Sequence, residues 1–200
     1  MNKILAAHIR DDGTVQTILE HLLGTANLSK KFGQVFGGGE HAYLCGLLHD
    51  IGKYSEKFQK RIYQGGNKVD HSTAGAVEIN KAVAQIGFLL SYCIAGHHTG
   101  LPDGGSFADS ADEPTLNGRL KRVLESYEHY RRDINLELFS IKPLLPIRPL
   151  GKAGFSVSFY IRMLFSCLVD SDFLDTEGFM EGDKGRGSFS LIDDLNHGEL

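Results

Sequence analysis

The chain has 200 residues, 42% of them hydrophobic and 23% charged, with a formal net charge of −4. This length suits one globular domain with an adequate core, and the composition is that of an ordinary soluble protein. The negative net charge argues against broad, nonspecific DNA binding. DNA binding through a local basic patch remains an open alternative. No apolar segment reaches the length of a membrane span, and no signal peptide is recognisable. We therefore expect a cytoplasmic protein with no membrane partner.

Hydrophobic spacing predicts helices through most of the first half of the chain. The first is expected over 14–36 with Thr14 as its N-cap, and the second over 40–50. A short helix over 55–64 ends at a pair of glycines. A further helix opens at 70–72, with Asp70 or Ser72 as its cap, and a strongly apolar one runs over about 82–96 and ends at His97-His98.

The second half is expected to hold a polar loop over 99–115 and two more helices. An amphipathic helix over 116–135 carries basic side chains that we interpret as a solvated face, and its tyrosines fit the edge of a core better than a base-stacking role. Prolines make 141–154 irregular, and the last helix covers 155–174. No period-2 run is long enough for a sheet, so the fold class is all-α, a compact helical bundle. In the helix expected over 116–135, the basic side chains are Arg119, Lys121, Arg122, Arg131 and Arg132, and the tyrosines are Tyr127 and Tyr130.

The most informative feature is the pair His49-Asp50, which closes an apolar helical run and precedes Ile51-Gly52-Lys53. Both side chains are costly to bury unless something pairs with them. A metal ion would pair with both, because imidazole and carboxylate are ligands for divalent transition metals. Adjacent helical residues point about 100° apart, so both can face one ion only if the helix ends there, which Gly52 permits.

The chain offers further ligands of the same chemistry, namely His21, His71, His97 and His98. His21 shares a stripe with apolar residues and is expected to point inward. Asp50 has two oxygens and can bridge two ions. A two-metal centre is the natural arrangement for phosphodiester cleavage, because it activates water and holds the phosphate and the leaving oxygen.

Asp170 and Asp172 compete for a remaining carboxylate position. Asp170 continues a polar line on the last helix, whereas Asp172 continues an apolar one. A carboxylate on a buried stripe needs a partner, so we favour Asp172. A polar cleft would instead favour Asp170, and the periodicity alone leaves both open.

Several segments in this order resemble the HD metal-dependent phosphohydrolases, and more closely the HD nuclease domain of the CRISPR-associated helicase-nuclease of type I systems. The resemblance covers about 8–177, and the order of its motifs is more specific than the His-Asp core alone. The segments are His21-Leu-Leu-Gly-Thr-Ala-Asn-Leu28, Gly46-Leu-Leu-His-Asp-Ile-Gly-Lys53, Phe58-Gln59, Asp70-His71-Ser-Thr-Ala-Gly-Ala76, Gly96-His-His-Thr-Gly-Leu101 and Leu168-Val-Asp-Ser-Asp-Phe-Leu-Asp-Thr-Glu177.

The resemblance implies a role for each matching residue. One ion would be held by His21, His49, Asp50 and Asp172, and a second by His71, His97 and His98, with Asp50 bridging. Lys53 would lie near the scissile phosphate and offset its charge, so Asp50 and Lys53 are the expected catalytic residues. The family's last Asp precedes a bulky apolar residue, as Asp172 precedes Phe173, which also favours Asp172. The cofactors implied are one or two divalent transition-metal ions, Fe, Mn, Co or Ni, with Mg as an alternative.

The function implied is hydrolysis of single-stranded DNA during CRISPR type I antiviral interference. The partners implied are a superfamily 2 helicase domain and an RNA-guided Cascade complex. These 200 residues contain no P-loop motif, so the helicase is expected on another chain or beyond residue 200. We expect an HD nuclease domain over 1–177 and a tail or linker over 178–200. The alternatives are an HD phosphohydrolase acting on a nucleotide or small phosphate ester, and a non-catalytic docking module for a helicase.

Overall fold

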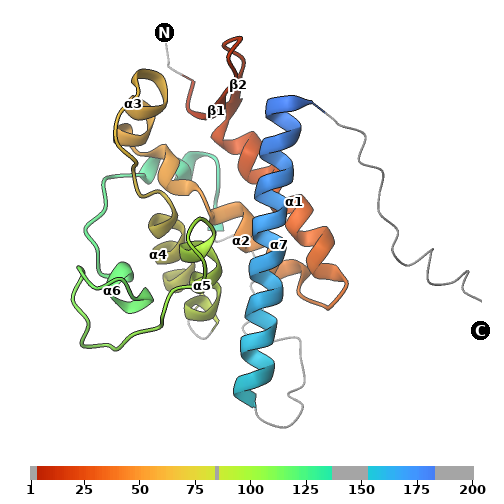
Figure 1. Cartoon of the computed structure of the whole chain (residues 1–200), viewed down its shortest axis with the longest axis vertical. Helices are drawn as coiled ribbons and strands as arrows, with labels where there is room; N and C mark the ends of the chain where they lie inside the picture. Colours follow the sequence, from red (N-terminus) through yellow and green to blue (C-terminus); the bar gives the residue numbers. More distant parts are fainter. Residues whose placement is uncertain (1–3, 84–85, 137–152, 183–200) are drawn as a thin grey trace, which may run out of the picture.

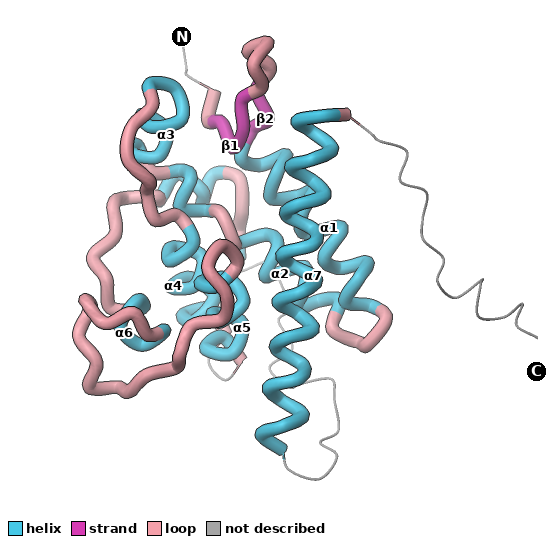
Figure 2. Tube along the Cα trace, viewed as in Figure 1, coloured by secondary structure: helices cyan, strands magenta, loops and turns pink. Residues whose placement is uncertain are grey.

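The computed structural model describes residues 4–83, 86–136 and 153–182, and within them the all-α prediction is confirmed (Figures 1 and 2). A two-stranded antiparallel hairpin, which the periodicity did not predict, is added at one end. The elements are β1 (Ala6–Ile9), β2 (Val15–Thr17), α1 (Ile18–Gln34), α2 (Gly39–Leu48), the 3-10 helix η1 (Ile51–Tyr54), α3 (Glu56–Gln64), α4 (Ser72–Ala82), α5 (Gly87–Gly96), α6 (Leu116–Leu120), the 3-10 helix η2 (Glu128–Arg132) and α7 (Ala153–Glu181).

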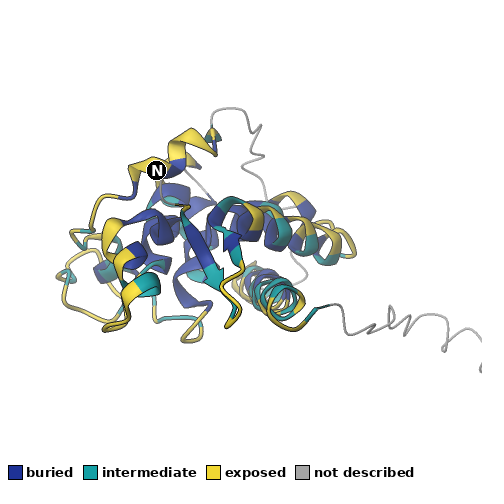
Figure 3. Cartoon of the chain, turned by 90° about the horizontal axis from the view of Figure 1, so that it is seen from above, coloured by how far each residue is buried: buried dark blue, intermediate teal, exposed yellow. Residues whose placement is uncertain are grey.

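The bundle has its core where α1, α2, α5 and α7 meet. α1 packs against both α2 and α7, while α4 packs against α5, which also reaches α7 (Figure 1). Side chains from all of these helices, among them Leu22, Leu48, Ile79, Ile94 and Leu164, are fully or almost fully buried. Seen from above, the buried residues line the inside of the bundle and the exposed ones its rim (Figure 3). The hairpin lies near the end of α7 that carries Glu181 (Figure 1).

The first helix begins later than predicted, at Ile18, and its N-cap is Thr17. The Thr17 hydroxyl accepts from the backbone N–H of Glu20, and the Glu20 carboxylate accepts from the backbone N–H of Thr17. This reciprocal capping box fixes the helix start more strongly than a lone threonine does. Residues 15–17, which the pattern placed in the helix, instead form β2 and pair with β1.

The predicted helix over 116–135 was wrong, because tertiary contacts override its periodicity. Only Leu116–Leu120 is α-helical, and the chain forms η2 after a non-helical stretch. Arg119 is not on a solvated face. Its side chain is 12% exposed and donates hydrogen bonds to the Ala95 carbonyl and to the Ser72 and Thr73 hydroxyls. This guanidinium joins α4, α5 and α6. The apolar helix expected over 82–96 is also shorter, beginning at Gly87.

The interpretation of Tyr127 and Tyr130 as core residues is confirmed. Both are buried, and both hydroxyls donate to the carboxylate of Glu78, which is itself 5% exposed. Burial acts to raise the pKa of Glu78, but the hydrogen bonds from Tyr130 and Tyr127 outweigh it and lower the pKa from its ordinary 4.5. These tyrosines are therefore engaged in holding η2 against α4.

Replacing Glu78 with alanine is expected to lower the free energy of unfolding by about 2–3 kcal/mol, because two buried hydroxyls lose their acceptor. Since the folded pKa of Glu78 is lowered, its contribution is present above pH 4.5 and is lost as the pH falls below that value. Urea denaturation measures both effects. The control is Glu128→Gln, whose exposed pair with Arg131 is worth little. Equal stabilities of the two variants would contradict the role of Glu78.

The last helix is longer than predicted and continues past 174 to Glu181, so the expected domain boundary at 177 falls inside it. By length and composition alone α7 is apolar enough to cross a membrane, contrary to the expectation that no segment reaches that length. It packs against α1, α2 and α5, and its buried residues face them. Of the stretch predicted to be irregular, 141–152 lies outside the described residues.

Candidate metal centre

Three chain segments deliver histidines at points where a helix begins or ends. His49 is the last αR residue of α2, and Asp50 leaves the helix with φ −119° and ψ 19°. His97 stands at the corresponding end of α5, and His71 directly precedes α4. A Cβ on Gly52 would lie 2.3 Å from the His71 carbonyl oxygen, so only glycine lets η1 approach α4 this closely. The predicted helix end at His49-Asp50 is confirmed.

Each of these three rings is anchored by its Nδ1 atom. Nδ1 lies 2.7 Å from the Gly46 carbonyl oxygen in His49, 2.7 Å from that of Ile94 in His97, and 2.8 Å from that of Val69 in His71. A carbonyl oxygen only accepts, so each Nδ1 carries the ring proton and donates a hydrogen bond to it. The Nε2 atoms are then free of that proton and turned towards one another, as second contacts orient metal-binding histidines.

The seven predicted ligands come together in two adjacent groups. One contains His21, His49, Asp50 and Asp172, and the other contains Asp50, His71, His97 and His98. In each group the ligand atoms all lie within 4.8 Å of one another. The sequence separations are large, so the bundle as a whole assembles this cluster.

Asp50 belongs to both groups through different oxygens. Its Oδ2 lies 3.4 Å from Nε2 of both His21 and His49, whereas Oδ1 lies 3.3 Å from Nε2 of His97 and 3.5 Å from that of His71. This is the arrangement expected of a carboxylate that bridges two cations. Burial acts to raise the pKa of Asp50, but the nearby Lys53 and histidines hold it well below its ordinary value, so the carboxylate is ionised.

The unsatisfied polar atoms of this cluster indicate that it is built for a cation. Oδ1 of the fully buried Asp50 and Nε2 of His97 have no hydrogen-bonding partner among the described residues, and Oδ2 of Asp50 is paired only with the Lys53 ammonium. Buried polar atoms without a partner are expensive. A divalent ion in each group would satisfy them, so the residues present fit a metal centre.

Facing ring nitrogens give a second indication. Nε2 of His21 lies 3.2 Å from Nε2 of His49, and Nε2 of His71 lies 2.8 Å from Nε2 of His98. Two imidazole nitrogens at such distances need a proton or another cation between them. Burial, followed by the charge of His97, lowers the pKa of His98 to about 4, so its ring is neutral, the form that binds metals.

The carboxylates in and beside the group of His21, His49, Asp50 and Asp172 favour positive charge there. Burial acts to lower the pKa of His21, but the carboxylates of Asp172, Asp175 and Asp50 beside its ring raise it to about 10. For Asp172, burial acts to raise the pKa, and the hydrogen bonds from His21 and His49 lower it far below its ordinary value. The same field that holds a proton on His21 would attract a metal cation in its place.

The structure separates the two competing aspartates. Oδ1 of Asp172 lies 3.3 Å from Nε2 of His21 and 3.5 Å from Nε2 of His49, and its side chain is 18% exposed. Asp170 is exposed and is in neither group. Placement therefore favours Asp172, as the apolar stripe and the family pattern did.

Asp175 was not predicted to have a role, although it lies one helical turn beyond Asp172. Its Oδ2 is 2.7 Å from Nδ1 of His21 and accepts a hydrogen bond from Gln16 at 2.8 Å. The Asp175 carboxylate thus anchors Nδ1 of His21, as backbone carbonyls anchor Nδ1 of His49, His71 and His97. A Cβ on Gly24 would lie 1.8 Å from Oδ1 of Asp175, so this carboxylate sits where only glycine leaves room.

Replacing Asp175 with asparagine is expected to weaken binding of divalent ions by about 10–100-fold, the usual cost of losing a contact that orients a histidine ligand. Titration calorimetry with Mn²⁺ measures the affinity. The matched control is Asp11→Asn, an exposed acid in the hairpin. Unchanged Mn²⁺ affinity in the Asp175 variant would show that this carboxylate is not needed to orient His21.

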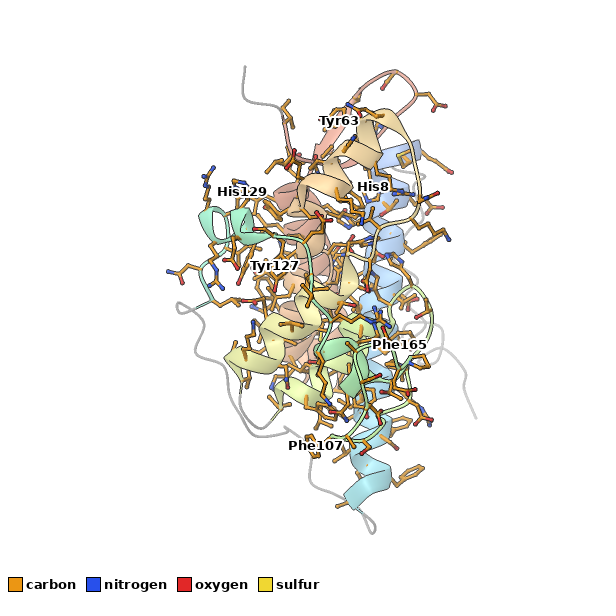
Figure 4. All side chains as sticks on the ribbon, turned by 90° about the vertical axis from the view of Figure 1, so that its left-hand side faces the viewer. His8, Tyr63, Phe107, Tyr127, His129 and Phe165 are labelled. Atoms are coloured by element: carbon orange, nitrogen blue, oxygen red, sulfur yellow. The ribbon has the colours of Figure 1, made fainter. Side chains whose placement is uncertain are left out.

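Lys53 is buried beside the cluster, with Nζ 2.7 Å from Oδ2 of Asp50 and 3.2 Å from Nε2 of His8. His8, for which the sequence predicted no direct role, comes from β1 and lines the same cleft as Lys53. Three other histidines have no predicted role. His41 is hydrogen-bonded to the Tyr160 hydroxyl, and His129 lies on η2, apart from His8 (Figure 4). His197 is outside the described residues.

A cleft of about 570 Å³ opens onto the cluster. Asp50, Lys53, His71, His98 and Asp172 line it, together with apolar side chains from β1, α3 and α7. A phosphate ester entering this cleft would reach both groups. The site thus combines two cation-seeking donor sets, a lysine and an access route, which is the equipment of a hydrolase that acts on phosphate esters.

Comparison with known proteins agrees with this geometry. The model of the HD domain family matches residues 18–141, more than half of the chain. A search of curated proteins found no match. The matched range includes the six predicted ligands from His21 to His98, while Asp172 lies beyond it. The chain therefore belongs to the HD domain family and is a metal-dependent phosphohydrolase.

Proposed function

We propose that this protein is a nuclease that hydrolyses phosphodiester bonds of single-stranded DNA in CRISPR type I antiviral interference. The observation that carries the proposal is the position of Asp50, whose two oxygens face separate groups of histidines. Two adjacent cation sites that share a carboxylate suit the cleavage of a phosphodiester, where the attacking and the leaving oxygen both need stabilisation. The resemblance of the ordered motifs to the type I nuclease domain supplies the substrate and the pathway.

Each residue of the site has a definite task in this proposal. His21, His49, Asp50 and Asp172 would hold one ion, and Asp50, His71, His97 and His98 the other. Bound divalent ions supply charge for the phosphate and a lowered pKa for an attacking water. The chain itself keeps Asp50 ionised, presents Nε2 of each anchored ring, and places the Lys53 ammonium beside Asp50, where it offsets negative charge brought by a phosphate.

The proposal includes partners and a location. A superfamily 2 helicase domain, on the same or a separate chain, would feed the single strand, and an RNA-guided Cascade complex would recruit both in the cytoplasm. The ions would be Fe, Mn, Co or Ni, because imidazole-rich sites suit these metals better than Mg.

The test is degradation of a circular single-stranded DNA by the purified protein supplied with Mn²⁺, Co²⁺, Ni²⁺ or Fe²⁺. We expect cleavage with at least one of these ions, and its loss in the presence of EDTA. Mononucleotides and duplex DNA are offered in parallel reactions. Hydrolysis of mononucleotides without cleavage of the circle would overturn the nuclease proposal and favour a phosphohydrolase acting on small esters.

A further inference from the structure

The cleft continues beyond the cluster along one face of α7. Val169, Phe173, Thr176 and Met180 all line it, at positions i, i+4, i+7 and i+11 of the helix. This spacing places their side chains on a single stripe. Asp172, next to Phe173, stands where the stripe meets the donor cluster. A ligand whose reacting group lies at the cluster therefore has room to extend along this stripe.

The stripe offers large apolar surface that the fold leaves uncovered. Phe173 is 58% exposed and Met180 is 41% exposed, although both belong to the wall of the cleft. An aromatic ring presented in this way is a platform on which the flat face of a nucleobase can stack. Phe58, on the opposite wall, is 2% exposed and is not available for stacking.

The wall opposite α7 carries a cation that has no acid to pair with. Arg61, on α3, lines the cleft, and no carboxylate of the described residues forms an ion pair with it. Its Nε is buried and has no hydrogen-bond acceptor among those residues. A guanidinium without a carboxylate partner on the wall of a cleft suits a phosphate, because its planar fork matches two phosphate oxygens.

The Phe58 ring lies between Arg61 and the donor cluster in the chain of contacts along this wall. The Phe58 ring lies 5.2 Å from the ring of His71, and its centroid is 5.7 Å from Nζ of Lys53 and 5.9 Å from Cζ of Arg61. The side chains of Lys53 and Arg61 thus both lie near the buried Phe58 ring. Lys53 also contacts Asp50 in the donor cluster, whereas Arg61 does not. Neighbouring phosphates of a single strand present two negative charges in a similar succession.

We infer that Arg61 and Phe173 form a nucleotide subsite next to the scissile phosphate, an inference that rests on the proposed nuclease function. The Arg61 guanidinium donates to the phosphate that follows or precedes the one being hydrolysed. The base of the nucleotide that joins these two phosphates stacks on Phe173, with Met180 adding apolar surface beside it. The subsite makes the enzyme prefer a strand with at least two consecutive phosphates over an isolated phosphodiester.

Charge decides in favour of a nucleotide strand as the occupant. An apolar peptide or acyl chain would fill the stripe on α7 but would leave the Arg61 guanidinium without an anion. A strand segment supplies both an anion for Arg61 and a flat apolar face for Phe173. It also reaches the donor cluster with a group that can be hydrolysed there.

The experiment compares two substrates in the presence of Mn²⁺. One is bis(p-nitrophenyl) phosphate, an isolated diester without a neighbouring phosphate, and the other is a short single-stranded oligonucleotide. Arg61→Gln is expected to lower the ratio of kcat/KM for the oligonucleotide over that for the small diester by about 10–100-fold, as loss of a charge-assisted hydrogen bond would. Phe173→Ala is expected to lower the same ratio by about 10-fold. Arg61→Lys should recover part of the loss, and Arg132→Gln, an exposed arginine outside the cleft, should match wild type.

A second substrate series tests the contact directly. The oligonucleotide carries one cleavable linkage, flanked on its 5′ or its 3′ side by a neutral methylphosphonate. At one of the two positions, replacing the phosphate with methylphosphonate should slow cleavage by wild type as much as the Arg61→Gln substitution does. The same replacement should not slow the Arg61→Gln variant further. An equal loss on both substrates in Arg61→Gln, or no loss at all, would overturn the subsite while the nuclease function stood. Failure of wild type to cut any oligonucleotide would instead overturn the nuclease function and the subsite with it.

Discussion

Replacing Asp50 with asparagine is expected to abolish metal-dependent hydrolysis while the helical fold survives. Asparagine has nearly the same shape, but it removes the negative charge that both groups of histidines share. A loss of about 4 kcal/mol of transition-state stabilisation, roughly a thousandfold in rate, follows from disabling both cation sites at once. The measurement is the cleavage rate of single-stranded DNA or, independently of the nuclease proposal, of bis(p-nitrophenyl) phosphate.

Circular dichroism and bound-metal analysis distinguish this result from unfolding. The variant should keep its helical spectrum and bind less metal than wild type. Lys53 loses its ion pair in this variant but retains the contact with His8. Full activity in the asparagine variant would refute the assignment of Asp50 as a shared ligand, and collapse of the spectrum would make the His49-Asp50 pair structural.

The second large effect is expected from a pair of neighbouring substitutions on α7. Asp172→Asn should reduce activity by roughly a hundredfold or more, because one group loses a charged donor that contacts both His21 and His49. Asp170→Asn should have no measurable effect, since Asp170 is exposed and outside both groups. The two variants carry the same chemical change two residues apart, which makes each the control of the other.

Elemental analysis gives the more direct readout for this pair. Asp172→Asn should lower the metal content of the protein or the affinity of one site, whereas Asp170→Asn should bind as wild type does. If Asp170→Asn were the inactive variant, the rotation of α7 about its axis would have to differ from that in the structure. The preference for Asp172, drawn from the apolar stripe, would then be wrong.

Local signals predicted the helices whose ends are marked in the sequence. The helix predicted over 55–64 is α3, which Ser55 caps and which Gly65 ends, as expected, with a positive φ of 78°. The same reasoning failed at 14–17, because a short stretch fits either a helix or a strand until its partner β1 is known. It failed again over 116–135, because the stripe of leucines and tyrosines reflects contacts with α4 and Glu78 rather than one continuous helix.

The candidate site could be predicted further than the fold around it. Burial of the His49-Asp50 pair at an apolar helix end indicated a cation, and the resemblance to the HD phosphohydrolases supplied the grouping of the other histidines. Asp175 was missed because several acids follow Leu168, and which of them face inward depends on the phase of α7 to within one residue. The place of Arg61 on the wall of the cleft was not predicted, because an arginine on a short polar helix is most often a solvated side chain.

The donors of one group are spread from residue 21 in α1 to residue 172 in α7. Domains emerge from the ribosome N-terminal end first, so the histidines are synthesised well before the final helix. A nascent chain therefore lacks its last carboxylate until α7 has been made and has docked on α1. Completion of this donor set is thus a late event in biogenesis, because a partly synthesised chain without α7 has no Asp172 to add to His21, His49 and Asp50.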